Sequence, residues 1–203
     1  MISPKEESQG NSSVTIELNL DDYMAIENKP DPVYADTKEE ALTAKPDYYF
    51  KKYPYMAKVS NVIKLFENDE YATMVYQSID ESDKNLEGLV VSKFNIKMID
   101  GKKQYGLILV HMAEMGGWRR KFEYGVRDQA PLYDFMASYS IVEGNRFIWG
   151  STNSEKIKTL RIEGQSPDEI IEYYSVGKPE YFWYYENLIS DKPSSEFEIE
   201  IGE

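Results

Sequence analysis

Residues 89–112 read LVVSKFNIKMIDGKKQYGLILVHM, two runs rich in β-branched, aromatic and aliphatic residues on either side of Asp100-Gly101. Runs of this composition are typical of β-strands. Asp and Gly tolerate the positive φ that a tight hairpin turn requires. The segment therefore predicts an antiparallel hairpin with its tip at Asp100-Gly101.

The same pattern repeats on both sides of this hairpin, over residues 58–66, 71–79, 120–126, 135–142, 146–152, 157–164 and 181–188. Turn residues at 67–70 and 143–145 look like two more hairpin tips. We therefore predict a mainly β fold, an antiparallel hairpin meander that forms a sandwich-like or curled sheet. An α+β arrangement is the alternative.

Two short helices are expected within this β pattern. Thr37 followed by Glu40 is a capping box, and it predicts a helix over 38–45 that Pro46 ends. The run Ser166-Pro167-Asp168-Glu169 combines an N-cap residue, a proline at the first helical position and two acids, and it predicts a second helix that ends before Gly177.

The two ends of the chain carry different signals. Residues 1–12 are polar and predict a flexible tail, followed by a single mainly β domain over 13–203. Within that domain, residues 13–20 and 196–201 alternate apolar with polar residues and predict edge strands. The longest apolar run, 107–112, is far short of the ~20 residues of a membrane-spanning helix, so we expect no transmembrane segment.

Composition excludes several functions. The net charge is −13, and nucleic acid is not an expected partner because phosphates are bound by clustered Lys and Arg. The chain has no cysteine, which removes disulfides, thiolate metal sites and cysteine nucleophiles. His111 is the single histidine, lies within an apolar run, and is interpreted as a hydrogen-bonded interior residue. We predict no catalytic residue, metal or cofactor.

Residues 180–188, EYFWYYENL, raise the possibility of a binding surface. Read as a strand, they place Tyr181, Trp183 and Tyr185 on one uncharged face, which we expect to be core. Phe182 and Tyr184 share the other face with two glutamates. Either the helix after Ser166, with residues such as Tyr174, covers them, or they form a platform for a peptide or a sugar ring. Phe182, Tyr184 and Tyr174 are thus candidate ligand-binding residues.

A second candidate is the basic bend EMGGWRRKF at 114–122. Trp118, Arg119 and Arg120 there could contact a phosphate, a carboxylate or the acidic ends of the chain. The alternative is a solvated hairpin shoulder anchored by the tryptophan.

Several segments together suggest where the protein acts. The runs TKEEAL, IKLFENDEYATMVYQS, FIWGSTN and KIKTLRIEGQSPDEIIEYYSVGKPEYFWYYENL resemble uncharacterised secreted or lipoprotein domains of Gram-positive bacteria, over about residues 36–190. The resemblance implies an extracytoplasmic location, with a lipid anchor on a removed N-terminal segment. A cytoplasmic location is the alternative.

The expected function is that of a non-enzymatic binding or accessory domain whose partner is a protein, a peptide or a cell-wall component. Two alternatives stay open. One is a hydrolase that acts on cell wall or carbohydrate with a carboxylate pair. The other is a cytoplasmic regulatory protein.

Overall fold

The computed structural model describes residues 30–81, 87–114 and 135–202. The chain divides into two compact units, Met1–Asp31 and Pro32–Glu203, and the helices and strands below all belong to the second. Strands account for 47% of the structure and helices for 17%, which confirms a mainly β fold. The predicted tail at 1–12 and the predicted strands at 13–20 and 120–126 lie outside the described residues.

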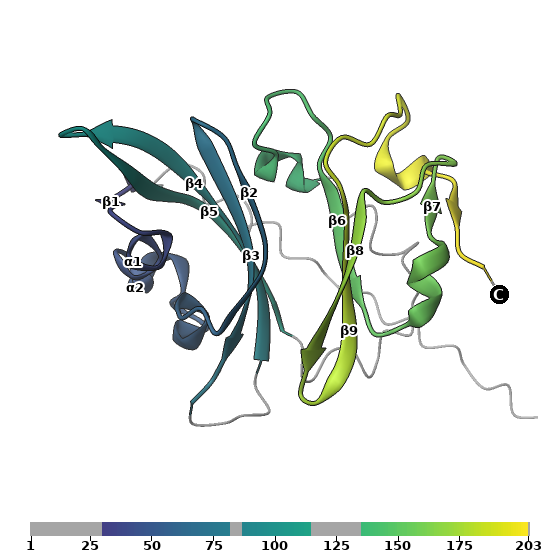
Figure 1. The fold of residues 1–203 in the computed structure, drawn as a ribbon, viewed down its shortest axis with the longest axis horizontal. Coiled ribbons are helices and arrows are strands. Elements are labelled where there is room, and N and C mark those ends of the chain that lie inside the picture. The colour runs from purple at the N-terminus through teal and green to yellow at the C-terminus, as the bar shows by residue number, and fades with distance from the viewer. Residues whose placement is uncertain (1–29, 82–86, 115–134, 203) are drawn as a thin grey trace, which may run out of the picture. The chain divides into compact units, whose positions relative to one another are not determined.

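Five antiparallel strands form sheet A, in the order β1-β5-β4-β3-β2 (Figure 1). They are β1 (Tyr34–Ala35), β2 (Asn61–Glu67), β3 (Tyr71–Ile79), β4 (Glu87–Ile99) and β5 (Lys102–Glu114). Strands β2 to β5 pair in sequence order, as a hairpin meander requires, and β1 joins at the edge beside β5.

The turn between β4 and β5 confirms the hairpin predicted at its centre. Asp100 has φ 50° and Gly101 has φ 76°, and Ile99 pairs with Lys102 across the turn. Both central residues thus occupy the left-handed region, which matches the right-handed twist of the flanking strands.

A layer of short helices covers one face of sheet A. It consists of α1 (Lys38–Thr43), α2 (Pro46–Tyr49) and the 3-10 helix η2 (Pro54–Ala57). The capping box is present: the Thr37 hydroxyl accepts from the Glu40 N–H at 3.2 Å, and the Thr37 N–H donates to the Glu40 carboxylate at 3.3 Å. α1 ends at Thr43, two residues before the predicted end at Lys45, and Pro46 begins α2. Leu42, Phe50 and Met56 pack with sheet residues that include Met74, Tyr76 and Phe94.

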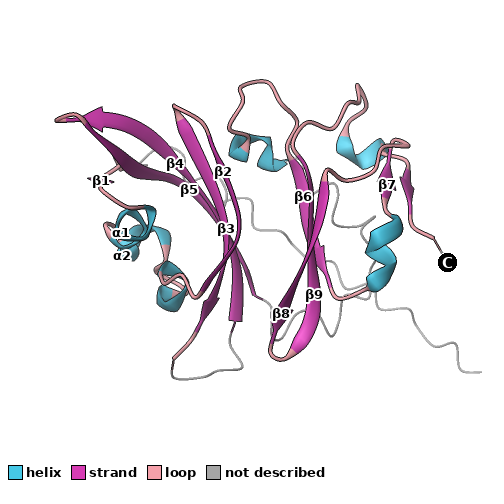
Figure 2. Cartoon of the chain, in the orientation of Figure 1, coloured by secondary structure: helices cyan, strands magenta, loops and turns pink. Residues whose placement is uncertain are grey.

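Three further strands form sheet B, in the order β6-β9-β8. They are β6 (Ile148–Thr152), β8 (Glu169–Ser175) and the central β9 (Lys178–Tyr185). One face of sheet B shares a core with Phe66, Val75, Leu89 and Val91 of sheet A. The two sheets therefore pack face to face, as the two strand layers in Figure 2 show, and the sandwich-like prediction is confirmed.

The outer face of sheet B has its own cover. The 3-10 helix η4 (Glu155–Thr159) and the small antiparallel pair β7 (Arg161–Ile162) and β10 (Ile199–Glu200) enclose an apolar cluster on that side. The 3-10 helix η5 (Ser194–Glu196) precedes β10. The strand predicted over 196–201 is thus real but reduced to Ile199–Glu200.

The helix predicted after Ser166 is wrong, because this segment forms strand β8. Val176 at φ 48° and Gly177 at φ 71° make the turn of a hairpin that pairs β8 with β9. Pairing with β9 and burial of alternate residues outweigh the local helix-start signal. Gly177, interpreted as a helix terminator, supplies the positive φ of a tight turn instead.

The strand predicted over 135–142 is also wrong in form. Residues Phe135–Tyr139 make the 3-10 helix η3, and the loop after it leads to β6. The Thr73 hydroxyl donates to the Tyr139 carbonyl at 2.6 Å, and the Asn68 amide donates to the Ile141 carbonyl at 2.6 Å. The side chains of Thr73 and Asn68 thus satisfy backbone carbonyls that hydrogen bonds to a neighbouring strand would satisfy in a sheet.

His111 lies on β5 beside the other sheet. Its ring packs edge-to-face on Trp149 of β6, with ring centroids 5.5 Å apart. Burial lowers the pKa of His111 to about 4. His111 is only partly buried, so the predicted interior position is met in part, and its contact among the described residues is aromatic and not a hydrogen bond.

Candidate functional site

The structure buries the two aromatic residues predicted as a platform. Phe182 is 0% exposed and Tyr184 is 3% exposed. The Tyr184 ring lies 4.8 Å from that of Phe66 on sheet A, centroid to centroid. The open-platform interpretation is wrong for both residues because an entire sheet, and not a helix, covers this face of β9. The core positions predicted for Tyr181, Trp183 and Tyr185 are confirmed.

Tyr174 is exposed, at 64%, but it stands apart from the other two candidates. It lies opposite Pro179 on β9, whereas Phe182 pairs with Ile171 and Tyr184 with Glu169. Because side chains alternate across a strand, Tyr174 points to the opposite face of sheet B from Phe182 and Tyr184. Trp118, Arg119 and Arg120 lie outside the described residues, so the anionic contact site stays a prediction.

Three polar groups join the two sheets along one edge. The Lys64 ammonium on β2 donates to the Glu169 carboxylate on β8 at 2.6 Å, and the Tyr184 hydroxyl donates to the same oxygen at 2.8 Å. These hydrogen bonds lower the pKa of Glu169 and raise that of Lys64, with the Glu169 bond the largest cause for Lys64. Desolvation raises the pKa of Tyr184. The group therefore holds an ion pair with a neutral phenol beside it.

A shallow pocket opens next to this edge. Phe66 of β2 and Glu186, the residue after β9, line it from two sides. The η3–β6 segment contributes the rest of the lining, namely Tyr139, Ser140, Ile141, Val142, Asn145 and Phe147. Phe66 is shared, because the Lys64 ammonium also lies 5.8 Å from its ring centroid. The pocket has room for about one water molecule.

Hydrogen bonds fix one wall of the pocket in place. The Lys93 ammonium donates to the carbonyls of Ser138 and Ser140, each at 2.7 Å. The Ser140 hydroxyl donates to the Val142 carbonyl at 2.8 Å. The bonds from Lys93, together with those to Tyr139 and Ile141, tie the segment to sheet A, and the Ser140 bond holds its own turn. The lining of the pocket is therefore preformed.

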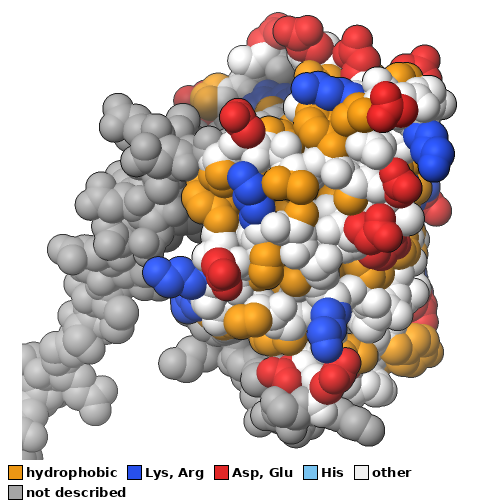
Figure 3. Space-filling view, turned by 90° about the vertical axis from the view of Figure 1, so that its left-hand side faces the viewer, with side chains coloured by type: hydrophobic (Ala, Val, Ile, Leu, Met, Phe, Trp, Pro, Cys, Tyr) orange, Lys and Arg blue, Asp and Glu red, His pale blue; other side chains and the backbone are white. Residues whose placement is uncertain are grey.

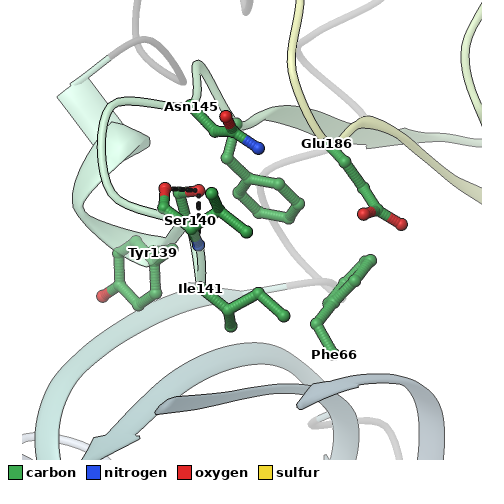
Figure 4. Close-up of a pocket in the computed structure, with 8 residues that line it drawn as sticks. Phe66, Tyr139, Ser140, Ile141, Asn145 and Glu186 are labelled. Carbon is green, nitrogen blue, oxygen red and sulfur yellow. Dashed lines mark hydrogen bonds between the residues drawn. The ribbon is translucent and has the colours of Figure 1, made fainter. Parts of the chain in front are cut away.

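Two polar side chains sit at the mouth of the pocket. In Figure 4, the Glu186 carboxylate points toward Phe66, and the Asn145 amide lies to the upper left of Glu186. The backbone N–H of Glu186 donates to the Asp168 carboxylate at 2.7 Å, which sets the position of the residue. The Glu186 carboxylate and the Asn145 amide make no hydrogen bond or ion pair to another described residue. They are therefore available to a ligand.

The sequence reasoning did not select the pocket residues. The sequence predicts residues 140–142 as the end of a strand and residues 143–145 as a turn. A usable signal was present, since Ser, Glu, Gly and Asn close together favour a loop over a strand. The signal marks a loop and does not show that Phe66 and Glu186 meet it in space.

The face that carries the helix layer has a mixed surface. In Figure 3, acidic, basic and apolar side chains are interspersed over it. Among the described residues, no group of three or more His, Cys, Asp or Glu is placed to hold a metal ion. In the same part of the chain, no helix has the length and apolar character needed to cross a membrane.

Comparisons of the chain with protein-family models, with curated proteins and with solved structures gave no match.

Proposed function

We propose that this chain is a non-enzymatic binding domain that receives the end group of one side chain of a partner polypeptide in the pocket beside Phe66. The observation that carries the proposal is the pairing of a preformed apolar lining with two available polar groups, Glu186 and Asn145. Ligand sites combine apolar walls with a few polar groups that orient the ligand. Protein interfaces also concentrate their binding energy on a few anchor side chains that fill small pockets.

The pocket supports binding better than hydrolysis. A glycosidase needs two carboxyl groups about 5 to 10 Å apart at the bond to be cleaved. Among the described residues that line the pocket, Glu186 alone carries a carboxylate. The pocket also accommodates about one water molecule, which is too little room for a sugar ring.

An extracytoplasmic location is part of the proposal and rests on the resemblance to secreted and lipoprotein domains. A surface domain of this kind would meet other proteins, peptides or cell-wall components. Fractionation of the native cells tests the location. Recovery of the protein in the cytosolic fraction alone would contradict it.

A peptide-display selection on the full chain tests the binding function. Val142 lines the pocket and is 48% exposed, so Val142→Phe should fill the mouth without disturbing the core. Met98→Phe on β4, at a residue that is 66% exposed, is the matched control. Peptides enriched on the wild type should bind Met98→Phe equally and Val142→Phe at least about tenfold more weakly, with circular dichroism confirming that both variants fold. Equal binding to all three proteins would show that the pocket is not the site.

A further inference from the structure

We infer that the group received by the pocket is a primary ammonium, carried by a lysine side chain of the partner polypeptide. This inference rests on the proposed function and specifies the ligand of the same site. It depends on three observations: how the protein holds its own Lys64, what the neighbouring pocket presents, and how much room the pocket has.

Lys64 shows how this edge of the molecule holds an ammonium. Its nitrogen lies 2.6 Å from a Glu169 oxygen, 5.3 Å from the Tyr184 ring centroid and 5.8 Å from the Phe66 ring centroid. A carboxylate neutralises the charge, and aromatic rings within about 6 Å add cation–π attraction. The hydrogen bond to Glu169, and after it the one to Tyr184, stabilise the charged form and raise the pKa of Lys64.

The pocket presents the same two components, a carboxylate and aromatic rings. Its carboxylate is Glu186, which has no partner among the described residues and points toward Phe66 (Figure 4). Its aromatic lining consists of Phe66, Phe147 and Tyr139. Phe66 thus belongs to both arrangements, since it lies near the Lys64 ammonium and also lines the pocket.

Size selects lysine over arginine. An ammonium head is about as large as a water molecule, and the pocket has room for about one. A guanidinium is a wider, planar group with five donors in a fixed fork, and it cannot enter without moving the walls. Those walls are held by the hydrogen bonds from Lys93, Thr73 and Asn68.

The charge of the surrounding chain favours a cation as well. The whole chain has a net charge of −13. A field of one sign raises the local concentration of oppositely charged ligands and speeds their association, in a manner that salt weakens. A lysine-bearing partner would therefore be attracted before it reaches the pocket.

The test is an NMR titration of the full chain with three probes, namely Nα-acetyl-lysine-N-methylamide, its arginine counterpart and its neutral Nε-acetylated form. We expect the lysine probe to shift the backbone amides of Ile141–Phe147 and Glu186, and the other two to bind at least about tenfold more weakly. Glu186→Gln should weaken the lysine probe at least about tenfold. Glu200→Gln, which removes the same charge from an exposed position on β10, should leave it within about twofold.

Two results would overturn the inference. One is binding of the neutral or the arginine probe as strong as that of the lysine probe. The other is an unchanged affinity in Glu186→Gln. If, in either case, displayed peptides still require the open pocket, the ligand class is wrong and the binding function stands. If displayed peptides bind Val142→Phe normally, the binding function itself fails.

Discussion

Two glycines in buried strands provide a matched test of how rigid each core is. A Cβ added at Gly150 on β6 would lie 2.6 Å from Cε2 and 2.9 Å from Nε1 of Trp183, a ring that is 0% exposed. A Cβ added at Gly88 on β4 would instead meet the end of the Met56 side chain, at 3.1 Å from its sulfur. Neither glycine has a positive φ, so backbone strain does not separate the two.

The two alanine variants should therefore differ in stability. Overpacking a core costs about 1 to 3 kcal/mol, and replacing Gly by Ala returns about 0.4 to 1 kcal/mol through the unfolded chain. Trp183 is a rigid ring enclosed on all sides, so Gly150→Ala should lose roughly 1 to 2 kcal/mol. Met56 has three rotatable bonds and can turn its terminal methyl away, so Gly88→Ala should stay within about 1 kcal/mol of the wild type.

Urea unfolding at pH 7 measures both free energies under the same conditions. A decrease of 1 to 2 kcal/mol corresponds to a melting temperature lower by roughly 2 to 8 °C for a domain of this size. The reasoning fails if Gly88→Ala loses as much as Gly150→Ala, or if Gly150→Ala is as stable as the wild type. The first result would mean that Met56 cannot move aside, and the second that the packing of Trp183 over Gly150 does not limit the core between β6 and β9.

Two further predictions concern stability. The pKa of His111 is lowered to about 4 in the folded chain. Below pH 6.5 the unfolded chain therefore binds a proton at this residue and the folded chain does not. The free energy of unfolding should fall by up to about 2 kcal/mol between pH 7 and pH 5. His111→Gln should lack this part of the decrease in urea unfolding, and parallel pH curves for the two proteins would contradict the burial of a neutral imidazole. Trp183→Ala and Tyr184→Ala should each cost about 3 to 5 kcal/mol, because both rings are buried in cores on opposite faces of β9. If Tyr184→Ala cost less than half as much as Trp183→Ala, the inner face of β9 would be more open than the structure has it.

Local signals in the sequence predicted the parts of the fold that neighbouring residues determine. The turn at Asp100-Gly101 depends on the φ values those two residues tolerate. The start of α1 depends on a hydroxyl and a carboxylate three residues apart. In both cases the interacting groups lie within one turn of chain, so their spacing is visible in the sequence.

The predictions from sequence were wrong where residues far apart in the chain determine the structure. Ser166-Pro167 is a sound helix start taken alone, but Glu169–Ser175 pairs with β9 and buries alternate residues against sheet A. The burial of Tyr184 depends on Phe66, more than a hundred residues earlier. The pocket likewise combines Phe66, the 139–147 segment and Glu186. The spacing of residues within one segment does not predict that these three parts of the chain come together.

The position of β9 in the chain bears on how the protein is made on the ribosome. β9 supplies aromatic rings to both cores of sheet B, yet about 70 residues separate its end from the end of β5. At ~5 to 20 residues per second, the nascent chain takes roughly 4 to 14 s to extend that far. Until then, the inner face of sheet A, with Phe66, Val75, Leu89 and Val91, has no sheet B to cover it. The half-made chain, with this apolar face open to chaperones and to other nascent chains, is thus more prone to aggregate than the finished domain.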